Sequence, residues 1–173
     1  MEVFNGQVTI ELPEGYEPWD IKEPGAGADS GSLILLLSNS SDPDAANLPV
    51  SSPGLSFKST RNKNTRIIGV ETPEDWHSEK LEERLNMYSA LLARSLPLFE
   101  NYDMTYKQLN KNGAYIGQIR YAFATPEQDW YSSLLIFPVN GNEALINMVC
   151  TAEDADQAMV DFLSISNSIT VCG

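Results

Sequence analysis

Four stretches of alternating polar and apolar residues, separated by three turn sequences, constrain the fold more than any other feature of the chain. They lie between residues 104 and 150, and the turns contain Asn112-Gly113, TPEQD at 125–129 and NGN at 140–142. Asn-Gly between two alternating stretches is the strongest short-range indication of a β-hairpin. Because short turns join strands that run antiparallel, this half of the chain is predicted to form a four-stranded antiparallel meander.

Both faces of this meander are apolar. Ile119, Tyr121 and Phe123 alternate along one side of their strand, and the stretch 134–137 is apolar at every position. Successive side chains of a strand point to opposite faces, so a strand without polar positions is covered on both sides. We therefore expect helices or loops on both faces of the sheet.

Two amphipathic helices are expected, one on each side of the meander in sequence. Thr72-Pro73-Glu74-Asp75 combines an N-cap residue, a proline at the first helical position and an acid three residues after the cap, which predicts a helix start. Apolar residues spaced three and four apart then predict one buried stripe over about six turns: Leu81, Leu85, Tyr88, Leu92, Leu96 and Phe99. The residues 151–154 repeat the start pattern before a second stripe: Ala155, Ala158, Met159, Phe162, Ile165 and Ile169.

The first half of the chain is less regular. Val8, Ile10 and Leu12 alternate as in a strand, 32–39 is predicted to be a buried strand, and 55–70 to be one strand or a hairpin. Residues 38–54 are rich in Ser, Pro, Asn and Asp and are predicted to be a loop insertion. Strands, a long helix, a meander and a closing helix, in this order, predict an α+β fold.

Four basic residues gather in the stretch 55–70 of an otherwise acidic chain. They favour a sheet-edge strand that is protected from pairing with other chains; a basic contact patch is the alternative. The residues are Lys58, Arg61, Lys63 and Arg66.

Length and charge limit the functional classes. The 173 residues, 1–173, are expected to form a single domain, and the formal net charge of −13 disfavours nucleic acid, because phosphate binding needs clustered cations. No apolar run approaches the ~20 residues of a membrane-spanning helix. The first residues lack a signal-peptide pattern, which predicts a cytoplasmic protein; a periplasmic location stays open if a leader was removed. Cys150 and Cys172 lack the CxxC spacing of zinc and redox sites, and one bridge between them also stays open.

His77 is the only histidine, and it lies among the carboxylates Glu74, Asp75 and Glu79. A single imidazole excludes metal sites that need two histidine ligands, and the chain contains no GxSxG sequence to supply a nucleophilic serine. The position of His77 near a helix start predicts a half-exposed surface side chain. We therefore predict no catalytic residue, no cofactor and no metal ligand, and a hydrolase is the least favoured function.

Aromatic residues are the remaining candidates for function. Tyr16 and Trp19 follow the first predicted strand, and Trp130 and Tyr131 follow a turn. Tyr and Trp frequently carry the binding energy of protein interfaces. They also close the ends of hydrophobic cores, and both interpretations stay open.

Several short motifs occur in a distinctive order over residues 3–170. They are Leu12-Pro13-Glu14-Gly15-Tyr16 after the first strand, NGAYIGQIRY at 112–121 after the long helix, the meander that ends in TAED at 151–154, and FLSISNSI at 162–169. In this order they resemble the DcrB-like branch of the superfamily that includes PsbP of photosystem II. The stretch 38–54 is not part of that pattern.

The resemblance implies an α/β/α sandwich with a mainly antiparallel, twisted sheet, and a non-enzymatic binding or adaptor module. Members of the superfamily include envelope lipoproteins, subunits of larger assemblies, and Eag-type adaptors that hold effector transmembrane segments before type VI secretion. In those adaptors an apolar sheet surface binds helices, and Tyr121, Phe123 and Leu134 are the nearest equivalents here. The expected function is thus an adaptor or chaperone with a protein partner, and a homodimer stays open. An envelope domain with a structural or assembly role is the alternative.

Overall fold

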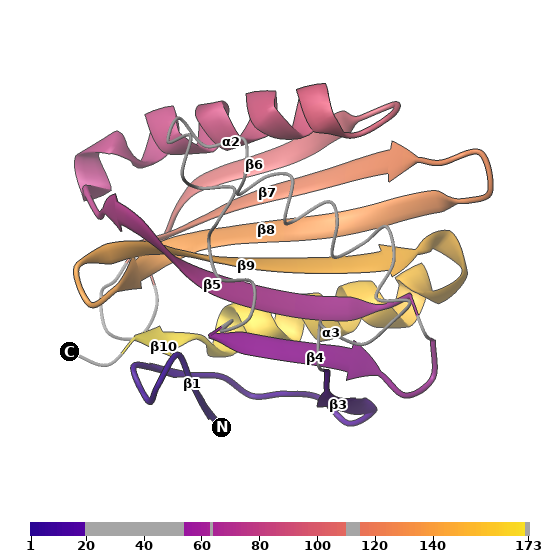
Figure 1. Ribbon diagram of the computed structural model, residues 1–173, viewed down its shortest axis with the longest axis horizontal. Helices are drawn as coiled ribbons and strands as arrows, with labels where there is room; N and C mark the ends of the chain where they lie inside the picture. The colour runs from indigo at the N-terminus through magenta and orange to yellow at the C-terminus, as the bar shows by residue number, and fades with distance from the viewer. Residues whose placement is uncertain (20–53, 63, 110–114, 172–173) are drawn as a thin grey trace.

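The computed structural model describes residues 1–19, 54–62, 64–109 and 115–171 (Figure 1). Its centre is a seven-stranded sheet in the order β3-β4-β5-β9-β8-β7-β6. Every pair of neighbouring strands in it is antiparallel. The strands are β3 (Tyr16–Pro18), β4 (Leu55–Ser59), β5 (Arg66–Asp75), β6 (Glu100–Leu109), β7 (Tyr115–Ala124), β8 (Asp129–Val139) and β9 (Asn142–Thr151).

A smaller sheet lies beside the ends of the chain. It has the order β1-β2-β10 and joins the N-terminal strands β1 (Glu2–Val3) and β2 (Val8–Thr9) to the C-terminal β10 (Thr170–Val171). The predicted first strand is therefore shorter than its alternating pattern. Val8 and Ile10 are nevertheless fully buried, so the N-terminal segment is part of the core.

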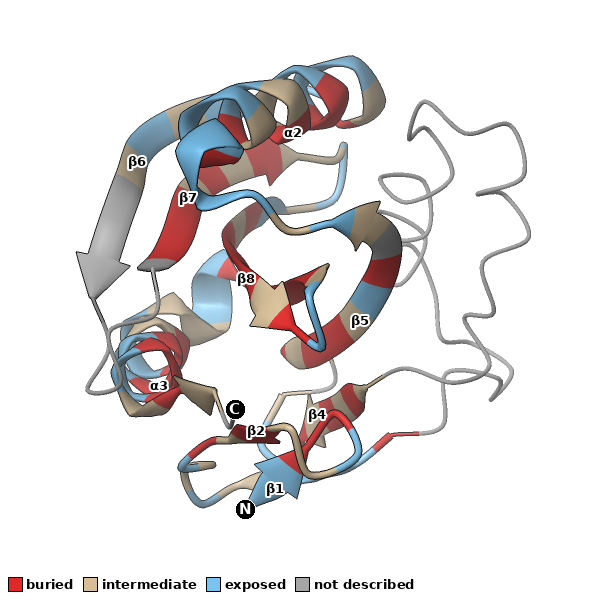
Figure 2. Ribbon diagram, turned by 90° about the vertical axis from the view of Figure 1, so that its left-hand side faces the viewer, coloured by how far each residue is buried: buried red, intermediate tan, exposed pale blue. Residues whose placement is uncertain are grey.

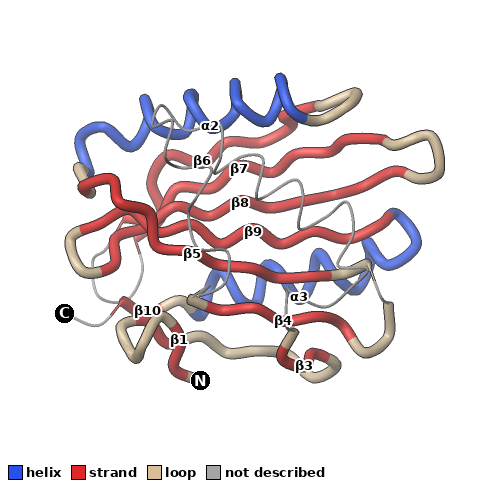
Figure 3. The backbone as a smooth tube through the Cα atoms, in the orientation of Figure 1, coloured by secondary structure: helices blue, strands red, loops and turns tan. Residues whose placement is uncertain are grey.

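The two α-helices of the described residues cover opposite faces of the large sheet (Figure 3). On one face α2 (Leu81–Ser95) packs on β6 and β7, and on the other α3 (Ala155–Ser168) packs on β8 and β9. Short 3₁₀ turns, η2 (Ser78–Lys80) and η3 (Ala152–Asp154), lead into them. The α+β sandwich with helices on both faces and the antiparallel meander are confirmed.

Each helix closes its own hydrophobic cluster, and the alternation of β8 supplies both. Leu134 and Ile136 pack under α2, whereas Leu135 and Phe137 pack under α3. Figure 2 shows that both helices turn their buried residues toward the sheet. The apolar run of β8 is therefore explained by burial of both faces of the strand, as the sequence predicted.

The predicted start of the long helix at Thr72 is wrong. Thr72 lies in β5, is buried, and its hydroxyl donates a hydrogen bond at 3.0 Å to the carbonyl oxygen of Glu143 in β9. Threonine is favoured in strands, so pairing of β5 with β9 outweighs the local capping pattern. α2 begins only at Leu81 and ends at Ser95, so Phe99 lies beyond the helix that was expected to include it.

The stretch 55–70 forms a hairpin of β4 and β5, and both strands lie inside the sheet. The prediction that its basic residues protect a sheet edge is therefore wrong. The Lys58 Nζ lies 3.9 Å from a carboxylate oxygen of Glu17, and Arg61 forms ion pairs with Asp154 and Asp161. The Arg66 guanidinium lies 4.5 Å from the centre of the Trp19 ring.

Some predictions fall outside the described residues. They concern the strand at 32–39, the insertion at 38–54, the Asn112-Gly113 turn, Lys63 and Cys172. On either side of that turn, β6 and β7 pair as expected, with Leu109 opposite Tyr115. Cys150 is a buried, free thiol, and burial raises its pKa to about 12.

Candidate functional site

The sheet face that carries α3 is only half covered. α3 packs on β8 and β9 and also reaches the first half of β7, where Ile116 and Gln118 are buried. Farther along β7, Arg120 and Ala122 on the same face are only half-buried. On the opposite face, α2 covers β6 and β7. We call the less covered region around Arg120 and Ala122, between α3 and the edge strand β6, the open groove.

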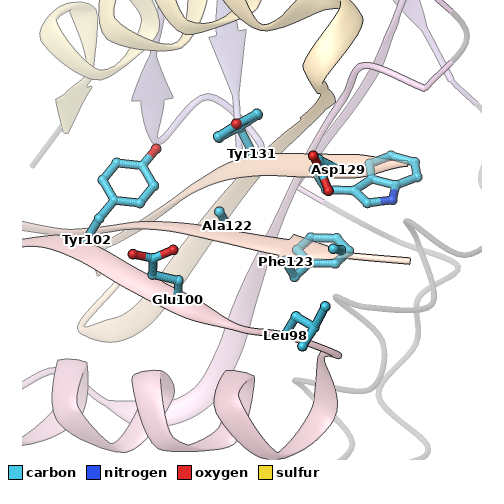
Figure 4. A pocket seen from close by; sticks show the side chains of 9 residues that line it. Leu98, Glu100, Tyr102, Ala122, Phe123, Asp129 and Tyr131 are labelled. Carbon is cyan, nitrogen blue, oxygen red and sulfur yellow. The ribbon is translucent and has the colours of Figure 1, made fainter. Parts of the chain in front are cut away.

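One end of the open groove is a hollow of about 620 Å³, which we call the edge pocket (Figure 4). Ala122 lies opposite both Glu100 and Tyr131 in the strand register, so these three side chains share the face of α3. In Figure 4 the rings of Tyr102 and Tyr131 project to the same side of the strands. The lining residues are Leu98, Glu100, Tyr102, Ala122, Phe123, Ala124, Asp129, Trp130 and Tyr131.

The other end is a smaller hollow of about 250 Å³ against α3, which we call the helix pocket. Its floor includes Arg120 and Ser133, which lie two residues from Ala122 and Tyr131 of the edge pocket. Alternate residues of a strand share a face, so the two hollows follow one another along β7 and β8. The lining residues are Gln118, Arg120, Ser133, Met159, Val160, Phe162 and Leu163.

Exposed apolar side chains concentrate at this groove. Among the described residues five large hydrophobic side chains are exposed, and four of them line the two pockets. Val160 is 61 % exposed and Leu98 is 82 % exposed. Single exposed apolar residues are normal on a protein surface, whereas a contiguous group marks an interaction site. The four are Leu98, Tyr102, Val160 and Leu163.

Two backbone features turn side chains into the edge pocket. The register of β6 and β7 shifts between Asn101 and Asp103, so Tyr102 is the extra residue of a β-bulge; bulges re-aim side chains and are frequent beside functional sites. Leu98 has a φ of 52°, in the left-handed region that costs a non-glycine residue roughly 1–2 kcal/mol. An exposed leucine in a strained conformation contributes little to the fold, so it is a candidate for function.

Both signs of charge occur along the groove, and Asp103 of β6 lies opposite Arg120 of β7 in the register. Glu100 and Asp129 line the edge pocket, and within the described residues neither carboxylate has an ion pair or a side-chain hydrogen bond. Arg120 lies farther along β7 in the helix pocket. Burial raises the pKa of the Tyr102 hydroxyl, which also senses the nearby Arg120 charge. The edge pocket therefore combines acidic and aromatic groups.

Three of the residues singled out in the sequence meet in the edge pocket. Phe123, Trp130 and Tyr131 line it, and the rings of Phe123 and Trp130 stack with centroids 5.8 Å apart. Phe123 and Trp130 are 6 % and 4 % exposed and belong to the hydrophobic cluster under α2, so of these three only the half-buried Tyr131 lies on the face of α3.

The other four lie elsewhere. Tyr121 and Leu134 are buried under α2, where the Tyr121 hydroxyl donates a hydrogen bond at 2.8 Å to Asn147 and burial raises its pKa to about 12. Trp19 is buried beneath Arg66. Tyr16 lies in β3 at the opposite edge of the sheet and donates a hydrogen bond at 2.8 Å to Asp161.

Sequence reasoning missed Leu98, Tyr102, Val160 and Leu163. Val160 and Leu163 could have been found, because they are apolar residues of a predicted helix that lie off its buried stripe. Tyr102 could not, since a bulge in an edge strand has no local sequence pattern.

Two polar networks elsewhere fasten the helices to the sheet. Arg84 of α2 donates hydrogen bonds to both carboxylate oxygens of the buried Glu143 at 2.9 and 3.0 Å, and Tyr88 donates to the same carboxylate. Burial alone would lower the pKa of the Arg84 guanidinium, but its bonds to Glu143 raise it above the ordinary value. Arg61 joins α3 through Asp161 at 2.7 Å. Each network thus joins one helix to the sheet through an arginine–carboxylate pair.

His77 is exposed, and its Nδ1 lies 3.5 Å from a Glu79 carboxylate oxygen. In the ranges that the structure describes, no group of three or more His, Cys, Asp or Glu side chains could hold a metal ion. None of the helices in those ranges is long and apolar enough to cross a membrane.

Known proteins resemble this chain in structure but not in sequence. No family model matches the sequence, and a search of curated proteins finds no relative. LpqN, involved in cell envelope biogenesis of Mycobacterium tuberculosis, has a TM-score of 0.58 at 10 % identity over 96 % of this chain and 83 % of its own. Cyanobacterial PsbP (CyanoP) from Synechocystis sp. PCC 6803 has a TM-score of 0.58 at 10 % identity over 99 % of this chain and 90 % of its own. The likeness shows a PsbP-like fold.

Proposed function

We propose that the protein is a non-enzymatic binding or adaptor module that docks a helix of a partner protein in the open groove. The observation that carries the proposal is the concentration of four of five exposed large hydrophobic side chains, in the described part of the chain, at the less covered part of one sheet face. A solvent-exposed apolar group of this kind is typical of a protein-binding surface.

The dimensions of the groove favour a helix as the occupant. α2 shows that two strands, β6 and β7, are the footprint of one helix on this sheet. Neighbouring strands lie about 4.8 Å apart, so around Arg120 and Ala122, beyond the part of β7 that α3 covers, the same two strands offer about 10 Å. A helix with its side chains is about 10–12 Å across. A partner helix would lie beside α3 and contact Val160 and Leu163.

An added strand is a weaker candidate. β6 is the edge strand beside the groove, but its register shifts twice along its pairing with β7. Bulges of this kind discourage another strand from pairing with an edge. The groove beside β6 is therefore a better docking site than the edge itself.

The cellular location is proposed from the motif order and from the structural neighbours. The motif order resembles DcrB-like proteins, among them adaptors and chaperones of secreted effectors, and one structural neighbour is involved in envelope biogenesis. An envelope domain of structural or assembly role, in the periplasm, is therefore the second candidate, and a cytoplasmic adaptor is the first. In both settings the groove would bind protein.

Site-specific photo-crosslinking in the source organism tests the docking site. A photoreactive phenylalanine analogue at Leu163 or Tyr102 is expected to capture a discrete partner, and the same analogue at Asn86, exposed on the outer side of α2, is expected to capture none. Val160→Asp should abolish the crosslink from Leu163 while the protein stays folded. Equal capture from Asn86, or no capture from the groove, would overturn the proposal.

A further inference from the structure

We infer that the edge pocket holds a lysine or arginine side chain of the docked helix. This inference rests on the proposed docking function and adds the chemistry that selects the partner. Four lining residues carry it: the carboxylates of Glu100 and Asp129, and the rings of Tyr102 and Tyr131.

The carboxylates of Glu100 and Asp129 form no ion pair within the described structure. Glu100 and Asp129 are exposed and line the same hollow, and no described basic residue forms an ion pair with either. Two unpaired acids beside a partly enclosed hollow attract a cation, and the net charge of −13 adds a long-range attraction for a basic segment.

The aromatic rings make the hollow suitable for an organic cation. The faces of Tyr and Trp attract ammonium and guanidinium groups within about 6 Å of the ring centre. Tyr102 and Tyr131 project to the same side of the strands, with Glu100 and Ala122 near them (Figure 4). Ala122 on the floor is small, so the hollow between the rings remains unfilled and can admit the end of a long side chain.

Arg120 gives the site a direction. It lies in the helix pocket, two residues from Ala122 along β7 and opposite Asp103 of β6 in the register. Its charge also reaches Tyr102, so it would repel a basic side chain least in the part of the edge pocket that Glu100 and Asp129 line. A docked helix is therefore oriented with its basic residue at the edge pocket and its apolar residues against Val160 and Leu163. Discrimination of this kind combines an attractive and a repulsive element.

Two synthetic peptides test the inference. Both are amphipathic, 14-residue helices of Leu, Ala and Gln with capped ends, and they differ only in one position of the last turn, which is Lys in one and the uncharged norleucine in the other. Binding is measured by fluorescence anisotropy of the labelled peptides, and the site is located by NMR shifts of the Ala122 and Tyr131 amides.

The Lys peptide is expected to bind about three- to tenfold more tightly than the norleucine peptide, as one cation–π contact and a half-exposed ion pair allow. The advantage should vanish in the double variant Glu100→Gln/Asp129→Asn. It should persist in the control Glu82→Gln/Glu83→Gln, which removes the same charge from two exposed residues of α2.

Each contrary result has one meaning. Equal binding of both peptides by the wild type would overturn the cation site and leave helix docking standing. Absence of binding by both peptides would overturn the docking function itself. A Lys advantage that survives Glu100→Gln/Asp129→Asn, or that the α2 control also loses, would show that the cation responds to net charge and not to the edge pocket, and would overturn the inference.

Discussion

The two faces of β7 differ although they belong to the same ten residues. On the face under α2, Ile119 and Tyr121 are almost fully buried and belong to a continuous core. On the other face, Ile116 and Gln118 are buried beside α3, whereas Arg120 and Ala122 are only half-buried and form the floor of the open groove. The covered face is built for stability, whereas the open face keeps charged and small residues that do little for stability. Substitutions on the two faces should therefore separate folding from binding.

The largest difference is expected between neighbouring residues of β7. Ile119→Ala removes a fully buried side chain and should lower the free energy of unfolding by about 2–5 kcal/mol, because the cavity under α2 refills only in part. Arg120→Ala on the opposite face should change it by no more than about 0.5 kcal/mol. Urea unfolding curves of the two variants and the wild type measure both values.

Leu163→Ala is the apolar control on the open face, since the Leu163 side chain is 47 % exposed. It should cost less than about 1 kcal/mol, because almost half of the Leu163 surface is already in water. A cost for Arg120→Ala or Leu163→Ala equal to that of Ile119→Ala would show that the open face is part of the core, and would remove the basis of the docking proposal.

The covered face could be predicted from the sequence, because burial dictates the spacing of its apolar residues. The stripe from Leu81 to Leu96 and the run 134–137 must be apolar in order to meet each other, so their spacing predicts both the helix and the sheet. The start of that helix was not readable. Thr72 has the local chemistry of a cap, and only its pairing with Glu143, 71 residues away, turns it into a strand residue.

The open face was harder to predict from the sequence, because only burial imposes a periodic apolar pattern. Its side chains are partly exposed, so they need not be apolar and form no periodic pattern. Tyr131 was identified by its residue type, whereas Tyr102 depends on a bulge and Leu98 on a backbone conformation. Phe123 and Trp130, identified in the same way, belong to the cluster under α2. Tyr121 was predicted to belong to an apolar binding surface. It is instead a core residue, 1 % exposed under α2.

An alkaline titration distinguishes tyrosines on the two faces. Tyr121 under α2 has a pKa raised to about 12 by burial, whereas a tyrosine of the unfolded chain ionises near pH ~10. The fold favours the neutral hydroxyl, so this stabilisation is fully present below pH ~10 and is lost as the pH rises toward ~12, by up to roughly 2.7 kcal/mol at about 1.36 kcal/mol per pKa unit.

Tyr121→Phe tests this window. At pH ~7 the variant should be less stable than the wild type by about 1 kcal/mol, because Asn147 loses a buried hydrogen-bond partner. The difference should shrink above pH ~10 and reverse near pH ~12, since the variant has no hydroxyl to ionise at this position. Tyr102→Phe in the edge pocket is the control and should match the wild type at pH ~7, as the Tyr102 hydroxyl has no side-chain hydrogen bond among the described residues. A pH-independent difference for Tyr121→Phe would contradict the assignment.

The smallest effect is expected at the rim of the groove and has the opposite sign. Leu98→Asn replaces a leucine with φ of 52° by a residue that visits the left-handed region readily, so it should raise the free energy of unfolding by about 0.5–1 kcal/mol and the Tm by about 1–4 °C. The matched control is the reverse exchange, Asn140→Leu, at an exposed position with φ of 54°, which should lower stability by a similar amount. Thermal unfolding of both variants measures the two shifts.

Leu98→Asn should also weaken capture of the partner from Tyr102 in the crosslinking assay. A stabilised variant with weakened capture would show that the open face gives up stability for binding, whereas a destabilised Leu98→Asn would mean that Leu98 packs in the fold and belongs with the covered face.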